Sequence, residues 1–180
     1  MRSLLIGFDR IVASLARAGA AVGALALLAS LGLIAYSVAM RYVFNRPPDW
    51  VDELVGYLLV ATVMAAAADA LRRGEHIAVD VLTERLSARG RRVVAAFGLI
   101  ASALVGVFLM HEGWSMVAFS RMVGAISTGH LEVPMAWPQM LVPVGGILLA
   151  LAGVAGLARM LLGLSPVVDE AVGSGAEGER

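Results

Sequence analysis

Four apolar stretches, separated by short charged segments, constrain this chain of 180 residues more than any other feature of its sequence. The first runs without a charge from Ala18 to Met40, and the fourth runs from Val133 to Ala158. Each can cross a hydrocarbon core of about 30 Å at about 1.5 Å per helical residue. The two middle stretches, Leu54 to Ala68 and Val93 to Met110, can also span if the charges at their ends lie at the interfaces. The sequence therefore predicts an all-α integral membrane protein with four transmembrane helices.

The composition agrees with a membrane protein and excludes several other classes. The chain is 59% hydrophobic and 16% charged, whereas a soluble domain carries about 25% charged residues. Its net charge is zero, so nothing indicates a nucleic-acid partner. It has no cysteine, which excludes disulfides, thiolate metal sites and cysteine nucleophiles.

We expect residues 1–165 to form one four-helix membrane domain, with spans at about 18–40, 51–71, 93–115 and 137–160. The glycine-rich, acidic residues 166–180 are expected to form a disordered cytoplasmic tail. Arginines ahead of the first span resemble the start of a signal peptide. The first span has 23 uncharged residues, however, which is more than the ~7–15 residues in the apolar region of a signal peptide. We therefore expect an uncleaved first helix.

The distribution of the arginines predicts the orientation. Eleven of the fourteen fall on the side that holds both termini and the segment between spans two and three, and only Arg41, Arg46 and Arg121 fall on the other. Because positive charge is retained in the cytoplasm, both termini are expected on the cytoplasmic side of the membrane. The three tryptophans, Trp50, Trp114 and Trp137, all lie near the predicted outer interface, as an aromatic belt would.

Two connecting segments carry local signals. Between spans two and three, apolar residues at helical spacing predict a short amphipathic cytoplasmic helix over about 76–89, lying on the membrane surface or, alternatively, packed on protein. Between spans one and two, Pro47 and Pro48 predict a tight turn in which Asp49 caps the next helix. Within the last span, Pro143 is expected to kink the helix about two turns in.

Small residues recur at four-residue spacing in the spans, which allows helices to approach closely. The alternative is that a chain rich in alanine and glycine produces these spacings by chance. If the steps at Gly146 and Gly156 face a partner subunit, bulky replacements there should weaken its binding. The other steps are Gly19 with Gly23, and Gly98 with Ser102 and Gly106.

Few polar residues are candidates for chemistry. Asp69 lies near the predicted cytoplasmic end of its helix, where Arg72 and Arg73 can reach it, so we favour a structural ion pair over a proton relay. Glu112 and His111 are expected at a wetted helix end. The sequence offers no catalytic set, no metal cluster and no cofactor site, and no charge lies at the midplane, where a transporter would hold a coupling ion.

Three stretches share a pattern with a known family. The first is Arg41-Tyr42-Val43-Phe44-Asn45 with Pro47, Trp50, Asp52 and Glu53. The second and most specific is Arg72-Arg73-Gly74-Glu75-His76-Ile77-Ala78-Val79-Asp80, in which Glu75 replaces a frequent glycine. The third comprises Val133-Pro134, Pro138 and Pro143-Val144-Gly145. Over roughly residues 10 to 162 the chain resembles the small permease subunit of tripartite ATP-independent periplasmic (TRAP) transporters, the DctQ-like family.

The resemblance implies a component of a sodium-driven importer for organic acids. Its partners would be a large permease subunit that holds substrate and sodium, a periplasmic binding protein that delivers the substrate, and membrane lipid. The small subunit would brace the scaffold, with its outer loops as a landing surface for the binding protein. His76 and Asp80 would be architectural residues that fix the inner loop.

Two other classes remain open from the residues alone. A stand-alone four-helix exporter would need an essential carboxylate in the membrane, yet the first span has no charge. The membrane anchor of an electron-transfer complex would need paired histidines within spans. Its candidates would be His111 and His130, and His130 follows Thr128-Gly129 in a loop.

Overall fold

The computed structural model describes residues 2–74 and 88–164, which form helices joined by turns, without a β-strand. The helices are α1 (Arg2–Tyr42), α2 (Trp50–Arg73), α4 (Ala88–Met122), α5 (Ala136–Gln139) and α6 (Leu141–Leu161). The all-α class is thus confirmed. The predicted amphipathic helix over 76–89 lies almost entirely outside the described residues, as does the predicted tail at 166–180.

In the part of the chain that the structure describes, four segments are long and apolar enough to cross a membrane: α1, α2, α4 and the combined α5 and α6. Three of the apolar stretches seen in the sequence lie wholly within α1, α2 and α4, and the fourth, Val133 to Ala158, begins three residues before α5. With 41 and 35 residues, α1 and α4 measure about 60 Å and about 50 Å at the standard rise. Because the hydrocarbon core is only about 30 Å thick, neither helix can lie wholly within it.

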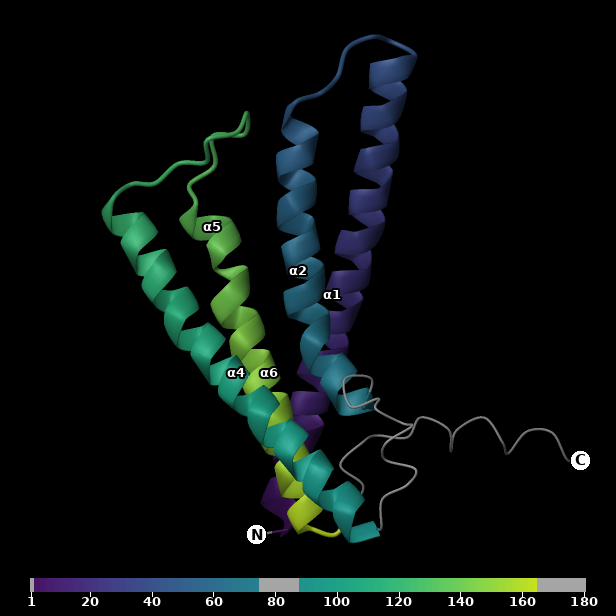
Figure 1. The fold of residues 1–180 in the computed structure, drawn as a ribbon, viewed down its shortest axis with the longest axis vertical. Coiled ribbons are helices and arrows are strands. Elements are labelled where there is room, and N and C mark those ends of the chain that lie inside the picture. Colours follow the sequence, from purple (N-terminus) through teal and green to yellow (C-terminus); the bar gives the residue numbers. More distant parts are fainter. Residues whose placement is uncertain (1, 75–87, 165–180) are drawn as a thin grey trace, which may run out of the picture.

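The helices form two hairpins that meet at one end of the molecule and diverge toward the other (Figure 1). One hairpin packs α1 along α2, and the second packs α4 along α6. The hairpins meet through α6, which contacts both α1 and α2. We call the end where the hairpins meet, which also holds the start of α1, the N-terminal end. The end that holds residues 43–49 and 123–135 is called the loop end.

Glycines create the close helix contacts, because a side chain at these positions would collide with a neighbouring backbone. A Cβ on Gly19 would lie 2.5 Å from the carbonyl oxygen of Ala65 in α2. One on Gly106 of α4 would lie 2.5 Å from the backbone nitrogen of Ala150 in α6. A Cβ on Gly145 of α6 would lie 2.6 Å from Cβ and 2.9 Å from the carbonyl oxygen of Met64 in α2, so this close contact joins the two hairpins.

Most of the small-residue steps are therefore used inside the chain, so the condition that the steps at Gly146 and Gly156 face a partner subunit is not met. Gly146 packs against Gly106 and Met110 of α4, and Gly156 packs against Leu99 of α4, so neither faces a partner subunit. Sequence spacing predicted that these helix faces pack closely but could not identify the neighbour. Gly98 is different, because a Cβ there would meet none of the described atoms within 4 Å.

The last span is interrupted near its start. α5 ends at Gln139 and α6 begins at Leu141, with Met140 between them. Pro143 causes this break, because it has no N–H for the carbonyl of Gln139 and its ring crowds that carbonyl. The irregularity thus lies one turn before the proline, which is itself buried in the first turn of α6.

Candidate functional site

At the loop end, Glu53 in the first turn of α2 is the acceptor for three donors. Its Oε1 accepts from the Tyr57 hydroxyl at 2.7 Å and also from the Ser127 hydroxyl. Its Oε2 accepts from the backbone N–H of Leu131 at 3.1 Å. Ser127 and Leu131 belong to the segment between α4 and α5, so this carboxylate fastens that segment to α2. We call Glu53, Tyr57, Ser127 and Leu131 the loop latch.

The segment that the latch holds is folded into a short hairpin of its own. The Ser127 N–H donates to the Val133 carbonyl at 2.9 Å, and the Met135 N–H donates to the Ala125 carbonyl at 3.0 Å. Gly129 lies at the tip, where a Cβ would displace the Glu53 carboxylate from its position in the latch. The hairpin bridges the two diverging helix pairs at the loop end (Figure 1).

Asp49 does not serve as the helix cap that the sequence predicted. It occupies the position before α2, but its side chain makes no capping hydrogen bond. Its carboxylate instead lies 3.6 Å from Nε2 of His130, at the tip of the latched hairpin. The prediction was wrong because a local preference was overridden by a contact from a residue eighty-one positions away in the chain.

The other residues of the first family motif, which connects α1 to α2, are exposed at the loop end. Tyr42 is 81% exposed and Phe44 is 62% exposed. Asn45 adopts a positive φ of 52°, a conformation that asparagine tolerates better than most residues. The Tyr36 ring lies 6.5 Å from the Trp50 ring, which links the end of α1 to the start of α2. Arg41, Tyr42 and Asp52 also line a shallow hollow of about 220 Å³ between these helix ends.

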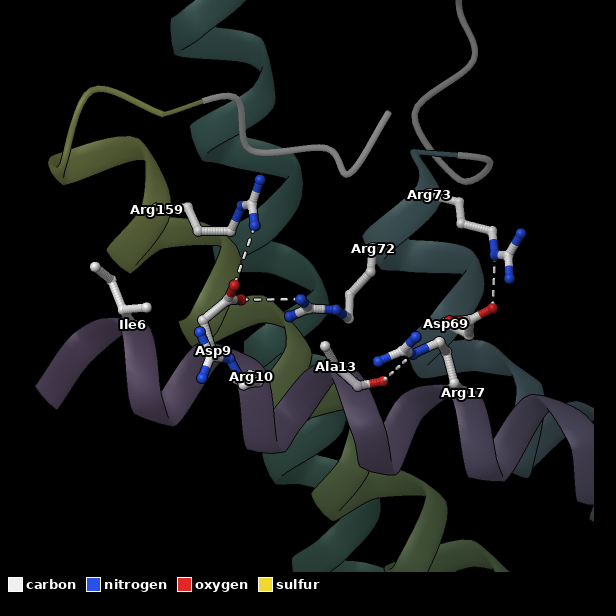
Figure 2. A pocket seen from close by; sticks show the side chains of 9 residues that line it. All are labelled: Ile6, Asp9, Arg10, Ala13, Arg17, Asp69, Arg72, Arg73 and Arg159. Carbon is white, nitrogen blue, oxygen red and sulfur yellow. Dashed lines mark hydrogen bonds and ion pairs between the residues drawn. The ribbon is translucent and has the colours of Figure 1, made fainter. Parts of the chain in front are cut away.

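At the N-terminal end, Asp9 of α1 joins three helices (Figure 2). Its Oδ1 lies 2.9 Å from Nη2 of Arg72 in α2, and its Oδ2 lies 3.0 Å from Nη1 of Arg159 in α6. Arg72 is only 7% exposed, so its charge depends on this carboxylate for compensation. We call Asp9, Arg72 and Arg159 the three-helix ion network.

The expected ion pair of Asp69 is present, with one change of partner. Asp69 Oδ2 accepts from Arg73 Nε at 2.7 Å, at the spacing of one helical turn. Arg72 was also expected beside Asp69, but it turns toward α1 and pairs with Asp9. Gly74 then ends α2 at φ 79°, with its N–H bonded to the last carbonyls of the helix, a left-handed cap that glycine adopts without strain.

The other residues predicted from the sequence either lie outside the described residues or make contacts only at the surface or within one helix. His76, Ile77 and Asp80 of the same motif lie outside the described residues. Pro138 lies in α5, beside the buried Ala136. His111 pairs with Glu112 at 3.2 Å on an exposed face, and His130 pairs with Asp49, so each histidine has an acidic neighbour at the surface. Within residues 2–74 and 88–164, no group of three histidine or acidic side chains is arranged to hold a metal ion.

Sequence reasoning missed Asp9, Arg159, Ser127 and Leu131. The sequence does contain a signal for Asp9, because it precedes the apolar residues Val12 and Ala16 by three and seven positions and so shares their helix face. In the structure Val12 and Ala16 are buried, which places Asp9 on the inward face of α1. Leu131 contributes a backbone N–H, for which the sequence contains no signal.

These features define a class of protein: a small multi-pass membrane protein whose ionic and latch contacts lie at the two ends of the helix bundle. The comparison with protein families is more specific. The chain belongs to the family described as "Tripartite ATP-independent periplasmic transporters, DctQ component", whose model matches residues 30–163. It is therefore a transporter component of the inner membrane.

Two curated relatives agree with this family. The chain is 22% identical over 143 residues to the sialic acid TRAP transporter small permease protein SiaQ of Vibrio cholerae, covering 77% of this chain and 80% of the relative. It is 36% identical over 101 residues to the C4-dicarboxylate TRAP transporter small permease protein DctQ of Rhodobacter capsulatus. That match covers 56% of this chain and 44% of the relative.

Proposed function

We propose that this chain is the non-transporting small subunit of a sodium-coupled importer for an organic acid. The substrates named for the two relatives, sialic acid and C4-dicarboxylate, are both carboxylic acids. In this proposal a large permease subunit holds substrate and sodium, and a periplasmic binding protein delivers the substrate. The small subunit braces the large one within the membrane.

The observation that carries this proposal is how little of each spanning helix is buried within the chain. In the most apolar window of the four spans, only 11% to 39% of the residues are buried. Large apolar side chains stay exposed along one face of α4, where Phe97, Leu104 and Phe108 are 64% to 73% exposed. Four helices that bury so little against each other leave a wide apolar surface for a larger membrane subunit and for lipid.

The loop end is the proposed landing surface for the binding protein. The loop latch holds the 123–135 hairpin against the start of α2, at the same end of the bundle as the exposed motif residues Tyr42 and Phe44. A preorganised surface binds a partner with less loss of conformational entropy than a free loop would. The arginine distribution supports placing this end in the periplasm and both termini in the cytoplasm.

Co-purification tests the partner directly. The affinity-tagged chain, produced together with its large subunit and extracted in mild detergent, is expected to retain that subunit at equal stoichiometry through size-exclusion chromatography. The same tagged chain from cells without the large subunit is the control. If the chain elutes without the large subunit while both are present in the membrane, the bracing role is wrong.

A further inference from the structure

A basic hollow lies between α1, α2 and α6 at the N-terminal end, around the three-helix ion network (Figure 2). It measures about 430 Å³. Its described lining holds five guanidinium groups and only two carboxylates, those of Asp9 and Asp69. The arginines are Arg10, Arg17, Arg72, Arg73 and Arg159. The lining side chains therefore carry a net positive charge.

Two of these arginines are not used by the ion pairs that join the helices. Arg10 and Arg17 stand two turns apart on α1, and both are exposed at the mouth of the hollow. Arg17 donates from Nε to the Ala13 carbonyl at 3.3 Å, which leaves its two terminal nitrogens directed toward the hollow (Figure 2). The rear of the hollow is fixed, because Arg72 is nine-tenths buried and held by Asp9.

A second, smaller hollow adjoins the basic one. It measures about 240 Å³ and shares Ile6, Asp9 and Arg159 with its neighbour. The rest of its lining is apolar and comes from the start of α1 and the end of α6: Leu5, Ala158, Leu162 and Leu164. A ligand that fits both hollows must have an anionic group joined to a hydrocarbon segment.

We infer that this pair of hollows is a binding site for an anionic phospholipid. The arginines of the basic hollow contact the phosphate, because guanidinium groups match phosphate oxygens in geometry and charge. The apolar hollow takes the first part of an acyl chain. The position fits, because the charge-free residues Ala18–Met40 of α1 are by themselves long enough to cross the hydrocarbon core, which leaves the arginine-bearing start of the helix at the depth of the lipid headgroups. Free inorganic phosphate would use the arginines but gain nothing from the apolar hollow.

Native mass spectrometry of the full-length protein, in the complex in which it is purified, can test the site. Phosphatidylglycerol is titrated in a neutral detergent against phosphatidylethanolamine with the same acyl chains. Because a basic residue near an anionic lipid surface contributes about five-fold in affinity, the double variant Arg10→Gln/Arg17→Gln is expected to bind phosphatidylglycerol about 25-fold more weakly. Its affinity for phosphatidylethanolamine should change little.

The matched control removes the same charge at the other end. Arg46→Gln/Arg121→Gln is expected to bind phosphatidylglycerol as the wild type does, and both double variants should keep the wild-type melting temperature because all four side chains are exposed. Equal loss in the two double variants would reveal a general charge effect and overturn the site. Displacement of the lipid by millimolar inorganic phosphate would instead assign the hollow to a free anion.

Discussion

At the residue scale, two carboxylates perform different tasks at opposite ends of the bundle. Glu53 collects three hydrogen bonds at the loop end, and Asp9 bridges two arginines at the N-terminal end. The Asp69 to Arg73 pair could be predicted from the sequence, because it depends only on helical spacing. The contact between Asp9 and Arg72 could not, because it depends on how α1 and α2 pack together.

The loop latch predicts a local effect of replacing Glu53. Glu53→Ala leaves two hydroxyls and the Leu131 N–H without their acceptor, so we expect residues 125–135 to detach from α2. Hydrogen bonds to a charged group contribute about 1.5–3 kcal/mol. Faster hydrogen exchange in residues 125–135, measured by mass spectrometry, is the expected result. Asp52→Ala, which removes the neighbouring exposed carboxylate, should leave that exchange unchanged, and equal rates in all three proteins would contradict the latch.

The two ion pairs at the N-terminal end should differ strongly in their effect on stability. Asp9→Asn leaves the charge of Arg72 buried without a counter-ion, which costs about 3 kcal/mol. Asp69→Asn removes the charge of a carboxylate that is only 11% exposed, but its arginine partner is 39% exposed and can remain solvated, and the amide oxygen can still accept from it. The cost should therefore be smaller, about 1 kcal/mol. Thermal unfolding in detergent should rank the variants in this order, and Asp69→Asn should keep most uptake by the assembled system. Complete loss of uptake at normal protein levels in Asp69→Asn would favour a relay role.

At the element scale, the spans could be predicted because their signal is apolar length, which the sequence states directly. The neighbour of each helix could not be predicted. Glycine steps appear on α1, α4 and α6, and nothing in their spacing shows that Gly146 and Gly156 pack on α4. The latched hairpin was also unpredictable, because its donors lie 74 and 78 residues from Glu53.

Packing of α4 on α6 gives a matched pair of substitutions on one helix. In Gly106→Leu, even the Cβ of the new side chain would lie 2.5 Å from the backbone nitrogen of Ala150. We therefore expect α4 and α6 to separate, with a loss of at least about 3 kcal/mol in the free energy of unfolding. Gly98→Leu makes the same change on an open face of α4. Unfolding followed by tryptophan fluorescence should show a large shift for Gly106→Leu only. Similar stability of the two variants would contradict the observed contact.

At the scale of the whole molecule, two hairpins meet at one end, and the loop latch bridges them at the other. Among the described residues, this arrangement leaves most residues of the spanning windows unburied and places the ion pairs and the loop latch toward the two ends. Such a molecule suits a scaffold better than a carrier, because a carrier needs a polar substrate site near the middle of the membrane.

The orientation can be tested on a clean background, because the chain has no cysteine. Single cysteines at Arg46 and Arg89 lie at opposite ends of the bundle and replace exposed side chains. A membrane-impermeant thiol reagent is expected to label position 46 in intact spheroplasts and position 89 only after permeabilisation. The reverse pattern would place the termini in the periplasm.

Uptake by proteoliposomes tests the central claim, that this chain is a scaffold subunit, most directly. The purified chain is reconstituted alone, or with its large subunit and the substrate-loaded binding protein, under an inward sodium gradient. We predict no uptake of the organic acid by the chain alone and gradient-dependent uptake by the complete set. Sodium-driven uptake by the chain alone would contradict the scaffold role, as would full uptake by the large subunit and binding protein without this chain.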